Sequence, residues 1–83
     1  MSNKAKQVAR LKSLPADFTW DEATRLLKLC DFEQLKSKGG SGRKFRHNSG
    51  VKFFAHEPHP EPILKKYALE DLIEALQNAG EIE

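Results

Sequence analysis

A β-hairpin between residues 43 and 56 decides the fold, and this stretch reads RKFRHNSGVKFFAH. Its two arms, Arg43–His47 and Val51–His56, carry the aromatic residues that strands favour. The residues between them, Asn48-Ser49-Gly50, are a turn signal typical of hairpins. In the first arm Phe45 stands between charged neighbours, as in a strand with one buried face. The stretch therefore predicts two antiparallel strands.

Of the two segments that flank this hairpin, only the one before it is predicted to add a strand to the sheet. Residues 32–35 read FEQL and predict a further strand, which a turn at residues 39–42 (GGSG) joins to the hairpin. On the other side, residues 56–62 contain three prolines. Because proline lacks the N–H donor that a sheet needs, we expect an extended loop there. The sheet should have three antiparallel strands.

Helices are predicted before and after the strands. Thr19 and Glu22 have the spacing of a capping box, in which each side chain binds the backbone N–H of the other residue. Apolar residues then follow at helical spacing, so we predict a helix over about residues 20–30. Phe18 and Trp20 should pack against its base. The members of this apolar stripe are Ala23, Leu26, Leu27 and Cys30.

A second apolar stripe predicts a helix near the C-terminus, with Gly80 in the place of a helix C-cap glycine. Residues 3–13 predict a short helix that Pro15 stops. The fold class is α+β, with two helices packed on one face of a three-stranded antiparallel sheet in the order α-β-β-β-α. We expect an N-terminal, partly helical extension at residues 1–18 and one domain at residues 19–83. The second stripe consists of Leu69, Leu72, Ile73 and Leu76.

The distribution of charge points to a polyanionic partner. No Asp or Glu lies between Gln34 and His56, and all the acidic residues lie outside this stretch. A basic element of this kind suits phosphate binding, and RNA is the partner we expect. The alternative is a pair of solvated strands whose cations only keep the protein soluble. The cations of the stretch are Lys36, Lys38, Arg43, Lys44, Arg46 and Lys52.

The alternation of a strand decides which of these cations face outward. If Phe45 points to the helices, Arg43 and His47 share its side, and Lys44 and Arg46 project from the open face. Either Phe53 or Phe54 must also face outward, since neighbouring residues alternate. An outward phenylalanine could stack on a base, or it could be covered by the loop or by a partner protein.

Composition excludes several other classes of protein. No apolar run approaches the roughly 18 residues of a membrane span, and the N-terminus lacks the apolar core of a secretory signal. The single cysteine, Cys30, rules out an internal disulfide and fits a reducing compartment. We therefore expect a cytoplasmic protein with no membrane partner and no cofactor.

The order of several short motifs resembles the HicA family of toxins. These motifs are Gly40-Ser41 before a basic strand, an aromatic strand ending in His56-x-Pro58-His59-Pro60, and a last helix ending in Asn78-Ala79-Gly80. The likeness runs from about Thr19 to Ile82 and is nearest to a longer branch with an N-terminal helical extension and a Lys66-Tyr67-type segment.

This resemblance implies a fold like that of a double-stranded RNA-binding domain. It also implies the cleavage of messenger RNA by a metal-independent endoribonuclease, as the toxin of a type II toxin–antitoxin system. The partners implied are messenger RNA and a HicB-like antitoxin, which would join the toxin in a hetero-oligomer.

The chain departs from the family at one important position. Many HicA proteins have a histidine directly after the Gly-Ser pair, where it is taken to be catalytic, but here that position is Gly42. Three hypotheses follow: another histidine acts, the protein binds RNA without cutting it, or the active residue has been lost or replaced.

Histidine and the basic residues could together cleave RNA. Histidine suits the proton transfers because it titrates near neutrality, and cations stabilise the charge at phosphorus. We predict His56 and His59 as catalytic, and no metal, although His-x-x-His could supply two zinc ligands. His47 shares the side of Phe45 and should be a packing residue. The predicted RNA-binding residues are Lys44, Arg46, Arg43, Ser41 and Lys52.

Overall fold

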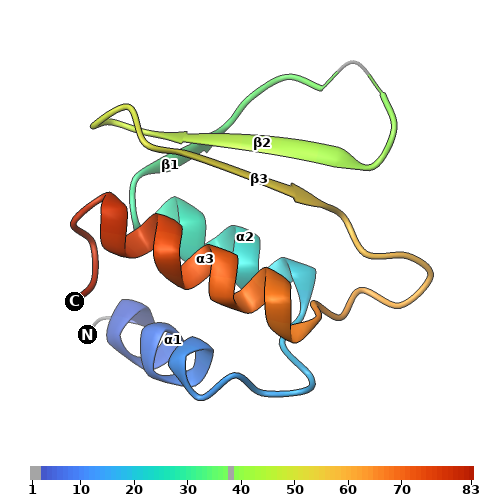
Figure 1. The fold of residues 1–83 in the computed structure, drawn as a ribbon, viewed down its shortest axis with the longest axis horizontal. Helices are drawn as coiled ribbons and strands as arrows, with labels where there is room; N and C mark the ends of the chain where they lie inside the picture. Colours follow the sequence, from blue (N-terminus) through green and yellow to red (C-terminus); the bar gives the residue numbers. More distant parts are fainter. Residues whose placement is uncertain (1–2, 38) are drawn as a thin grey trace.

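The computed structural model describes residues 3–37 and 39–83 (Figure 1). Along the chain the elements are two helices, three strands and a final helix, with a long loop before the last helix. Their bounds are α1 (Asn3–Lys12), α2 (Trp20–Leu29), β1 (Phe32–Gln34), β2 (Gly42–His47), β3 (Lys52–His56) and α3 (Lys66–Asn78). The predicted α+β fold with an N-terminal helix is confirmed, and it resembles a double-stranded RNA-binding domain.

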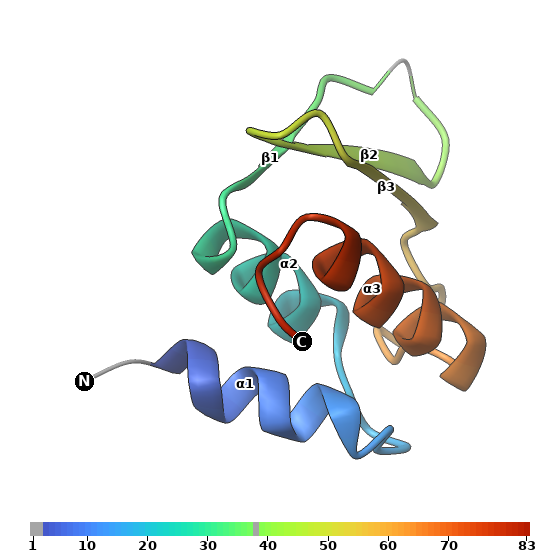
Figure 2. The same ribbon diagram turned by 60° about the vertical axis from the view of Figure 1, so that its left-hand side comes forward.

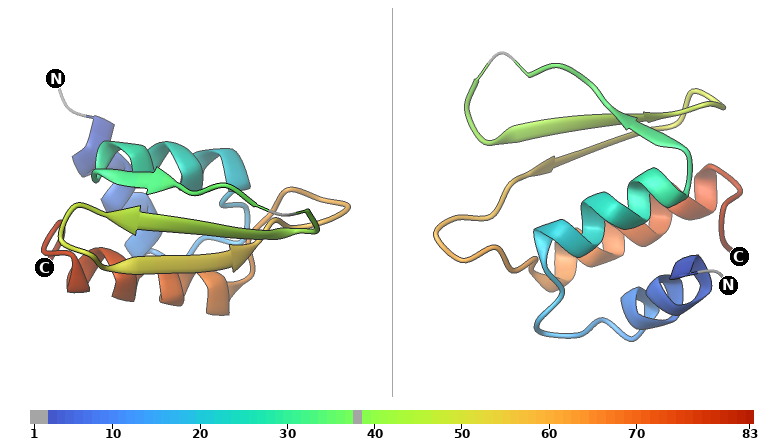
Figure 3. Two further views of the ribbon diagram at one scale, coloured as in Figure 1. Left: turned by 90° about the horizontal axis from the view of Figure 1, so that it is seen from above. Right: turned by 180° about the vertical axis from the view of Figure 1, so that it is seen from behind.

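The elements are stacked in three layers. The antiparallel sheet, in the order β1-β2-β3, forms one layer, and α2 and α3 lie side by side against one of its faces (Figures 1 and 2). Helix α1 lies on the far side of this helical pair, away from the sheet. Among the described residues, no helix or strand covers the other face of the sheet, which we call the open face (Figure 3, left).

The N-terminus of α2 is fixed by the predicted capping box. Glu22 N–H donates to Thr19 Oγ1 at 3.1 Å, and Thr19 N–H donates to Glu22 Oε1 at 3.0 Å. Arg10 of α1 binds the other oxygen of Glu22, with Nε 2.6 Å from Oε2. The same carboxylate therefore caps α2 and joins α1 to it.

The end of α3 turns the chain back toward the sheet. Gly80 has a φ of 75°, which favours glycine, and its N–H donates to the Gln77 carbonyl. Glu81 N–H donates to the Leu76 carbonyl at 3.0 Å, which completes a Schellman motif. The predicted glycine cap is confirmed, and it directs Glu81 toward the end of β2.

The core lies between the sheet and the helical pair and reaches α1. Phe18 and Trp20 are buried in it, as predicted, and so is Leu11 of α1. Cys30 is fully buried at the end of α2, and this burial raises the pKa of its thiol. A thiol in this position is a packing group and not an exposed nucleophile. No helix of the described residues is long and apolar enough to cross a membrane.

The register of the hairpin confirms the predicted alternation of its side chains. Phe45 lies opposite Phe53, and both rings are buried under the sheet. Lys44 lies opposite Phe54, and both side chains are exposed on the open face. Of the two adjacent phenylalanines, Phe54 is therefore the outward one.

Candidate nucleic-acid interface

Three of the predicted RNA-binding cations lie on the open face. Lys44 and Arg46 project from β2, and Lys52 of β3 lies opposite Arg46. All three are exposed. Glu33 of β1 is the neighbour of Arg46 on its other side, so the positive charge is concentrated over β2 and β3. This half of the open face presents the cations that a phosphate backbone requires. Lys38, from the same basic stretch, lies outside the described residues.

Arg43 is held within the protein. Its Nη1 donates to the carbonyl oxygens of Gly40 at 2.7 Å and Gly42 at 3.0 Å, and its Nη2 lies 3.2 Å from Glu57 Oε1. The guanidinium thus ties the glycine-rich turn to the loop that follows β3. Its predicted contact with RNA stays a prediction, and its present contacts give it a role in shaping this end of the sheet.

The ring of Phe54 lies across Gly42. A Cβ atom at position 42 would lie 3.1 Å from two atoms of this ring, which is tighter than ordinary van der Waals contact. The other neighbour of the ring is His56, whose ring it meets edge to face with centroids 5.1 Å apart. Phe54 is 52% exposed. The absence of a side chain at position 42 therefore gives the Phe54 ring its place beside His56.

His56 is oriented by the glycine-rich turn. Its Nδ1 lies 3.1 Å from Ser41 Oγ, and the backbone of Glu57 is bonded to the carbonyl of Ser41 at 2.8 Å. These contacts fix one nitrogen of the ring and leave Nε2 as the other functional atom. Ser41, predicted to bind RNA, thus contacts one of the predicted catalytic histidines.

His59 lines the same cavity as His56. The cavity has a volume of about 560 Å³ and lies where the loop after β3 returns to α3. Backbone bonds from Trp20 N–H to the Pro62 carbonyl and from Leu64 N–H to the Phe18 carbonyl, both 2.8 Å, hold the base of this loop. The structure therefore brings both predicted histidines to one cavity, together with Ser41, Glu57, Lys65 and Tyr67.

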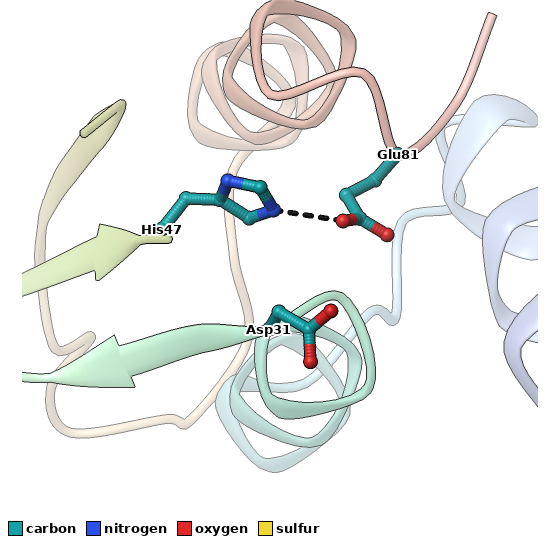
Figure 4. A group of neighbouring side chains, drawn as sticks. All are labelled: Asp31, His47 and Glu81. Carbon is teal, nitrogen blue, oxygen red and sulfur yellow. Dashed lines mark hydrogen bonds and ion pairs between the residues drawn. The ribbon is translucent and has the colours of Figure 1, made fainter. Parts of the chain in front are cut away.

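His47 is buried at the other end of β2, as its alternation predicted. Ser49 N–H donates to His47 Nδ1 at 3.0 Å, so the proton of the neutral ring is on Nε2, which lies 2.7 Å from Glu81 Oε2 (Figure 4). Both ring nitrogens are thus used in contacts within the protein. This histidine joins the strand end to the C-terminal segment.

Asp31 completes a cluster with His47 and Glu81 in which the possible metal-binding atoms lie within 4.8 Å of one another (Figure 4). The ammonium of Lys4 already lies 2.7 Å from Glu81 Oε1. The hydrogen bond from Lys4, and then that from His47, lower the pKa of Glu81. These contacts form a tie between α1, the sheet and the C-terminus, in which the Lys4 ammonium pairs with one oxygen of Glu81 and His47 contacts the other.

Sequence reasoning assigned no role to Lys65, Tyr67 or Asp71. Lys65 and Tyr67 line the larger cavity, and Tyr67 and Asp71 line a smaller one beside β3. Their proximity to His56 depends on how α3 packs along the edge of the sheet. The helical spacing of four residues between Tyr67 and Asp71 is the one sequence signal that places them on a common face.

Comparison with known families identifies the class of protein. The sequence profile of the family described as the HicA toxin of bacterial toxin–antitoxin systems matches residues 20–80, which include α2, all three strands and α3. No curated protein and no solved structure matched the chain. Since the matched residues make up more than half of the chain, this protein belongs to the HicA family of toxins.

Proposed function

We propose that this toxin is a metal-independent endoribonuclease that cleaves messenger RNA, with His56 as the base that starts the reaction. The observation that carries the proposal is the position of His56, which projects from the basic open face and is held by Ser41 at 3.1 Å. An oriented histidine beside phosphate-binding cations is the arrangement that RNA cleavage without a metal requires.

The proposed reaction is a transfer within the RNA. In the tautomer that donates from Nδ1 to Ser41 Oγ, Nε2 of His56 is unprotonated and takes the proton of a ribose 2′-hydroxyl. The 2′-oxygen then forms a bond to the adjacent phosphorus as the bond from phosphorus to the 5′-oxygen breaks. His59, in the loop that follows β3, lines the same cavity and gives a proton to the leaving 5′-oxygen. The products are a 2′,3′-cyclic phosphate and a 5′-hydroxyl.

Lys44, Arg46 and Lys52 would bind the phosphates that flank the cleaved bond. All three are exposed on the face from which His56 also projects, because the residues at 52, 54 and 56 share one side of β3. Lys65 lines the cavity with both histidines and is placed to neutralise charge that develops on the reacting phosphate.

A HicB-like antitoxin would inhibit the toxin by covering this region. Membership of a toxin–antitoxin family implies a protein partner, and the open face with its exposed Phe54 is the surface that RNA also needs. A partner that buries Phe54 and the three cations would exclude RNA by occupying the same surface, and it would form the hetero-oligomer in which the toxin is stored.

A non-catalytic RNA-binding module is the second candidate. It is favoured by the glycine at position 42, where many HicA proteins have a histidine. Such a module would use the same cations and Phe54 but would leave RNA intact.

Expression in bacteria separates the two candidates. Wild-type protein without an antitoxin should stop growth and fragment messenger RNA, whereas a His56→Ala/His59→Ala variant of equal abundance should do neither. If the double variant arrests growth as strongly as the wild type, His56 and His59 are not the catalytic groups. If the wild type leaves messenger RNA intact at every level of expression, the endoribonuclease proposal is wrong.

A further inference from the structure

A second, smaller cavity lies against the outer edge of β3. Its volume is about 180 Å³, which is close to the roughly 150 Å³ of an apolar cavity that takes a benzene ring. His56 lines both this cavity and the larger one, so the two adjoin at the proposed catalytic residue. The other residues that line it are Phe53, Phe54, Ala55, Tyr67, Ala68 and Asp71.

The edge of β3 supplies backbone donors and acceptors to this cavity. Within the hairpin, His47 N–H donates to the Val51 carbonyl and Glu57 N–H donates to the carbonyl of Ser41, so the odd-numbered residues of β3 bond to β2. In an antiparallel edge strand, the N–H and C=O groups of the alternate residues point away from the neighbouring strand. The backbones of Phe54 and His56 therefore face the outer edge, where the cavity lies.

Two side chains of α3 form the opposite side of the cavity. Tyr67 and Asp71 are four residues apart and so lie on one face of the helix. Tyr67 is 66% exposed, so much of its large, flat aromatic ring is accessible to solvent. Among the hydrogen bonds and ion pairs of residues 3–37 and 39–83, none engages the carboxylate of Asp71. An exposed ring and a carboxylate with spare acceptor capacity thus flank the backbone groups of β3.

We propose that this cavity is a base-specificity pocket that takes one nucleobase of single-stranded RNA beside the cleaved phosphate. The base stacks on Tyr67, its exocyclic amino group donates to Asp71, and its adjacent ring nitrogen accepts from a backbone N–H of β3. This inference rests on the proposed function, because the pocket is occupied when the neighbouring phosphate is at His56.

The chemistry of the pocket selects adenine and cytosine. Both bases present an amino donor next to an unprotonated ring nitrogen on their pairing edge. Uracil presents carbonyl oxygens there, which a carboxylate repels. Guanine has an amino donor on this edge, but the pairing-edge nitrogen next to it is protonated and cannot accept from the backbone N–H of β3. A site built to bind a donor discriminates strongly against a base that lacks it, because the polar groups of the site are left unpaired.

The test uses short oligouridine RNAs that carry one A, C, G or U at a central position. Each RNA is prepared in a cleavable form and in a form with a single 2′-deoxyribose that prevents cleavage. Cleavage rates are measured on the first and dissociation constants on the second, for the wild type, Asp71→Asn, Tyr67→Ala and Tyr67→Phe. The control is Glu70→Gln, which removes an exposed carboxylate of α3 that does not line the cavity.

The wild type should favour the RNAs with A or C by about tenfold or more in both measurements, which is the effect of a single polar contact. Asp71→Asn should reduce this preference below about threefold, while Glu70→Gln should retain it. Tyr67→Ala should weaken the binding of the preferred RNAs by about tenfold, which is in the range of one stacking contact. Tyr67→Phe keeps the aromatic ring and should leave this binding unchanged.

Equal binding and cleavage of all four RNAs by the wild type would overturn the inference and leave the endoribonuclease proposal standing. A preference that Asp71→Asn leaves unchanged would overturn it as well. If the wild type cleaves none of the RNAs, the endoribonuclease proposal fails, and the dissociation constants alone still decide whether the pocket selects a base. If Tyr67→Ala weakens only the binding of a HicB-like protein, the cavity is a protein-docking site and the inference is wrong.

Discussion

His56 lies directly opposite Gly42 in the register of β2 and β3. Side chains at two such opposed positions project from the same face of a sheet, with Cβ atoms about 5 Å apart. Many HicA proteins have their histidine at the position of Gly42, so the imidazole of His56 enters the same part of the open face from the neighbouring strand. The pairing of these two positions supports the hypothesis that His56 acts in this protein in place of a histidine at position 42.

A side chain at position 42 should disturb the proposed site without unfolding the protein. In Gly42→Ala the new Cβ would lie 3.1 Å from the Phe54 ring, which must then move away from its contact with His56. We expect cleavage to fall by about tenfold or more, since misplaced groups lose rate steeply, while stability changes by less than about 1 kcal/mol.

The movement is visible by NMR in the ring protons of His56, which should shift as the Phe54 ring leaves. Asn48→Ala, at the far end of the hairpin, is the control and should change neither the shifts nor the rate. A Gly42→Ala protein with wild-type rate and unchanged His56 shifts would show that the Phe54–His56 contact does not matter for activity.

Charge reversal on the open face should weaken RNA binding for all sequences alike. Lys44→Glu/Arg46→Glu removes two cations that we assign to phosphates, and each lost contact should reduce the slope of log K against log salt by about 0.7 for single strands. Titration of RNA at several salt concentrations measures this slope. Lys28→Glu, which changes an exposed lysine of α2 on the other side of the sheet, is the control. An unchanged slope in the double variant would place the RNA elsewhere.

Sequence reasoning predicted the fold well because its signals are local. The capping box at Thr19 and Glu22, the turn at residues 48–50 and the glycine at position 80 each act within a few residues, and all three are present. Alternation likewise placed Phe45 inside and Lys44 outside. Each of these features can be recognised without knowledge of the tertiary structure.

The candidate site was predictable only in part, because its contacts join distant segments. The choice between Phe53 and Phe54 required the register of the hairpin, and the contact of Ser41 with His56 joins residues 15 apart in sequence. The engagement of Arg43 by backbone carbonyls and Glu57 likewise depends on the path of the glycine-rich turn. No periodicity in the sequence contains this information.

The tie between the sheet and the C-terminus should contribute to stability. In Glu81→Ala the buried N–H of His47 loses its acceptor, and the ion pair between Lys4 and Glu81 is removed. An unsatisfied buried donor costs about 1–3 kcal/mol, so the free energy of unfolding should fall by about this amount in urea titrations. Glu83→Ala, in the same terminal segment, should have little effect. RNA affinity should be unchanged in both variants, and a parallel loss of affinity in Glu81→Ala would mean that the tie also shapes the open face.

Acid should weaken the connection between α1 and α2. The hydrogen bond from Arg10, helped by the capping contacts of Thr19, lowers the pKa of Glu22 from 4.5 to about 2. Because the folded pKa is lower, the ionised form stabilises the fold: this contribution is fully present above about pH 4.5 and is lost as the pH falls toward about 2.

Glu22→Gln should therefore be less stable than the wild type by about 1 kcal/mol near neutral pH, since the ion pair is partly solvent-exposed. The difference between the two proteins in urea titrations should shrink as the pH is lowered from about 5 to about 3. A difference that stays constant over this range would mean that the charge of Glu22 does not contribute.

The central claim is that His56 starts the cleavage of RNA, and its most direct test compares purified wild type with His56→Ala in single-turnover cleavage of a messenger RNA fragment, with the dissociation constant measured in parallel. We predict that His56→Ala lowers the rate by about a hundredfold or more, as expected for the loss of a general base. Its dissociation constant should stay within about threefold of the wild-type value. The products made by the wild type should carry a 2′,3′-cyclic phosphate. A His56→Ala protein that cleaves the fragment at the wild-type rate would contradict the account.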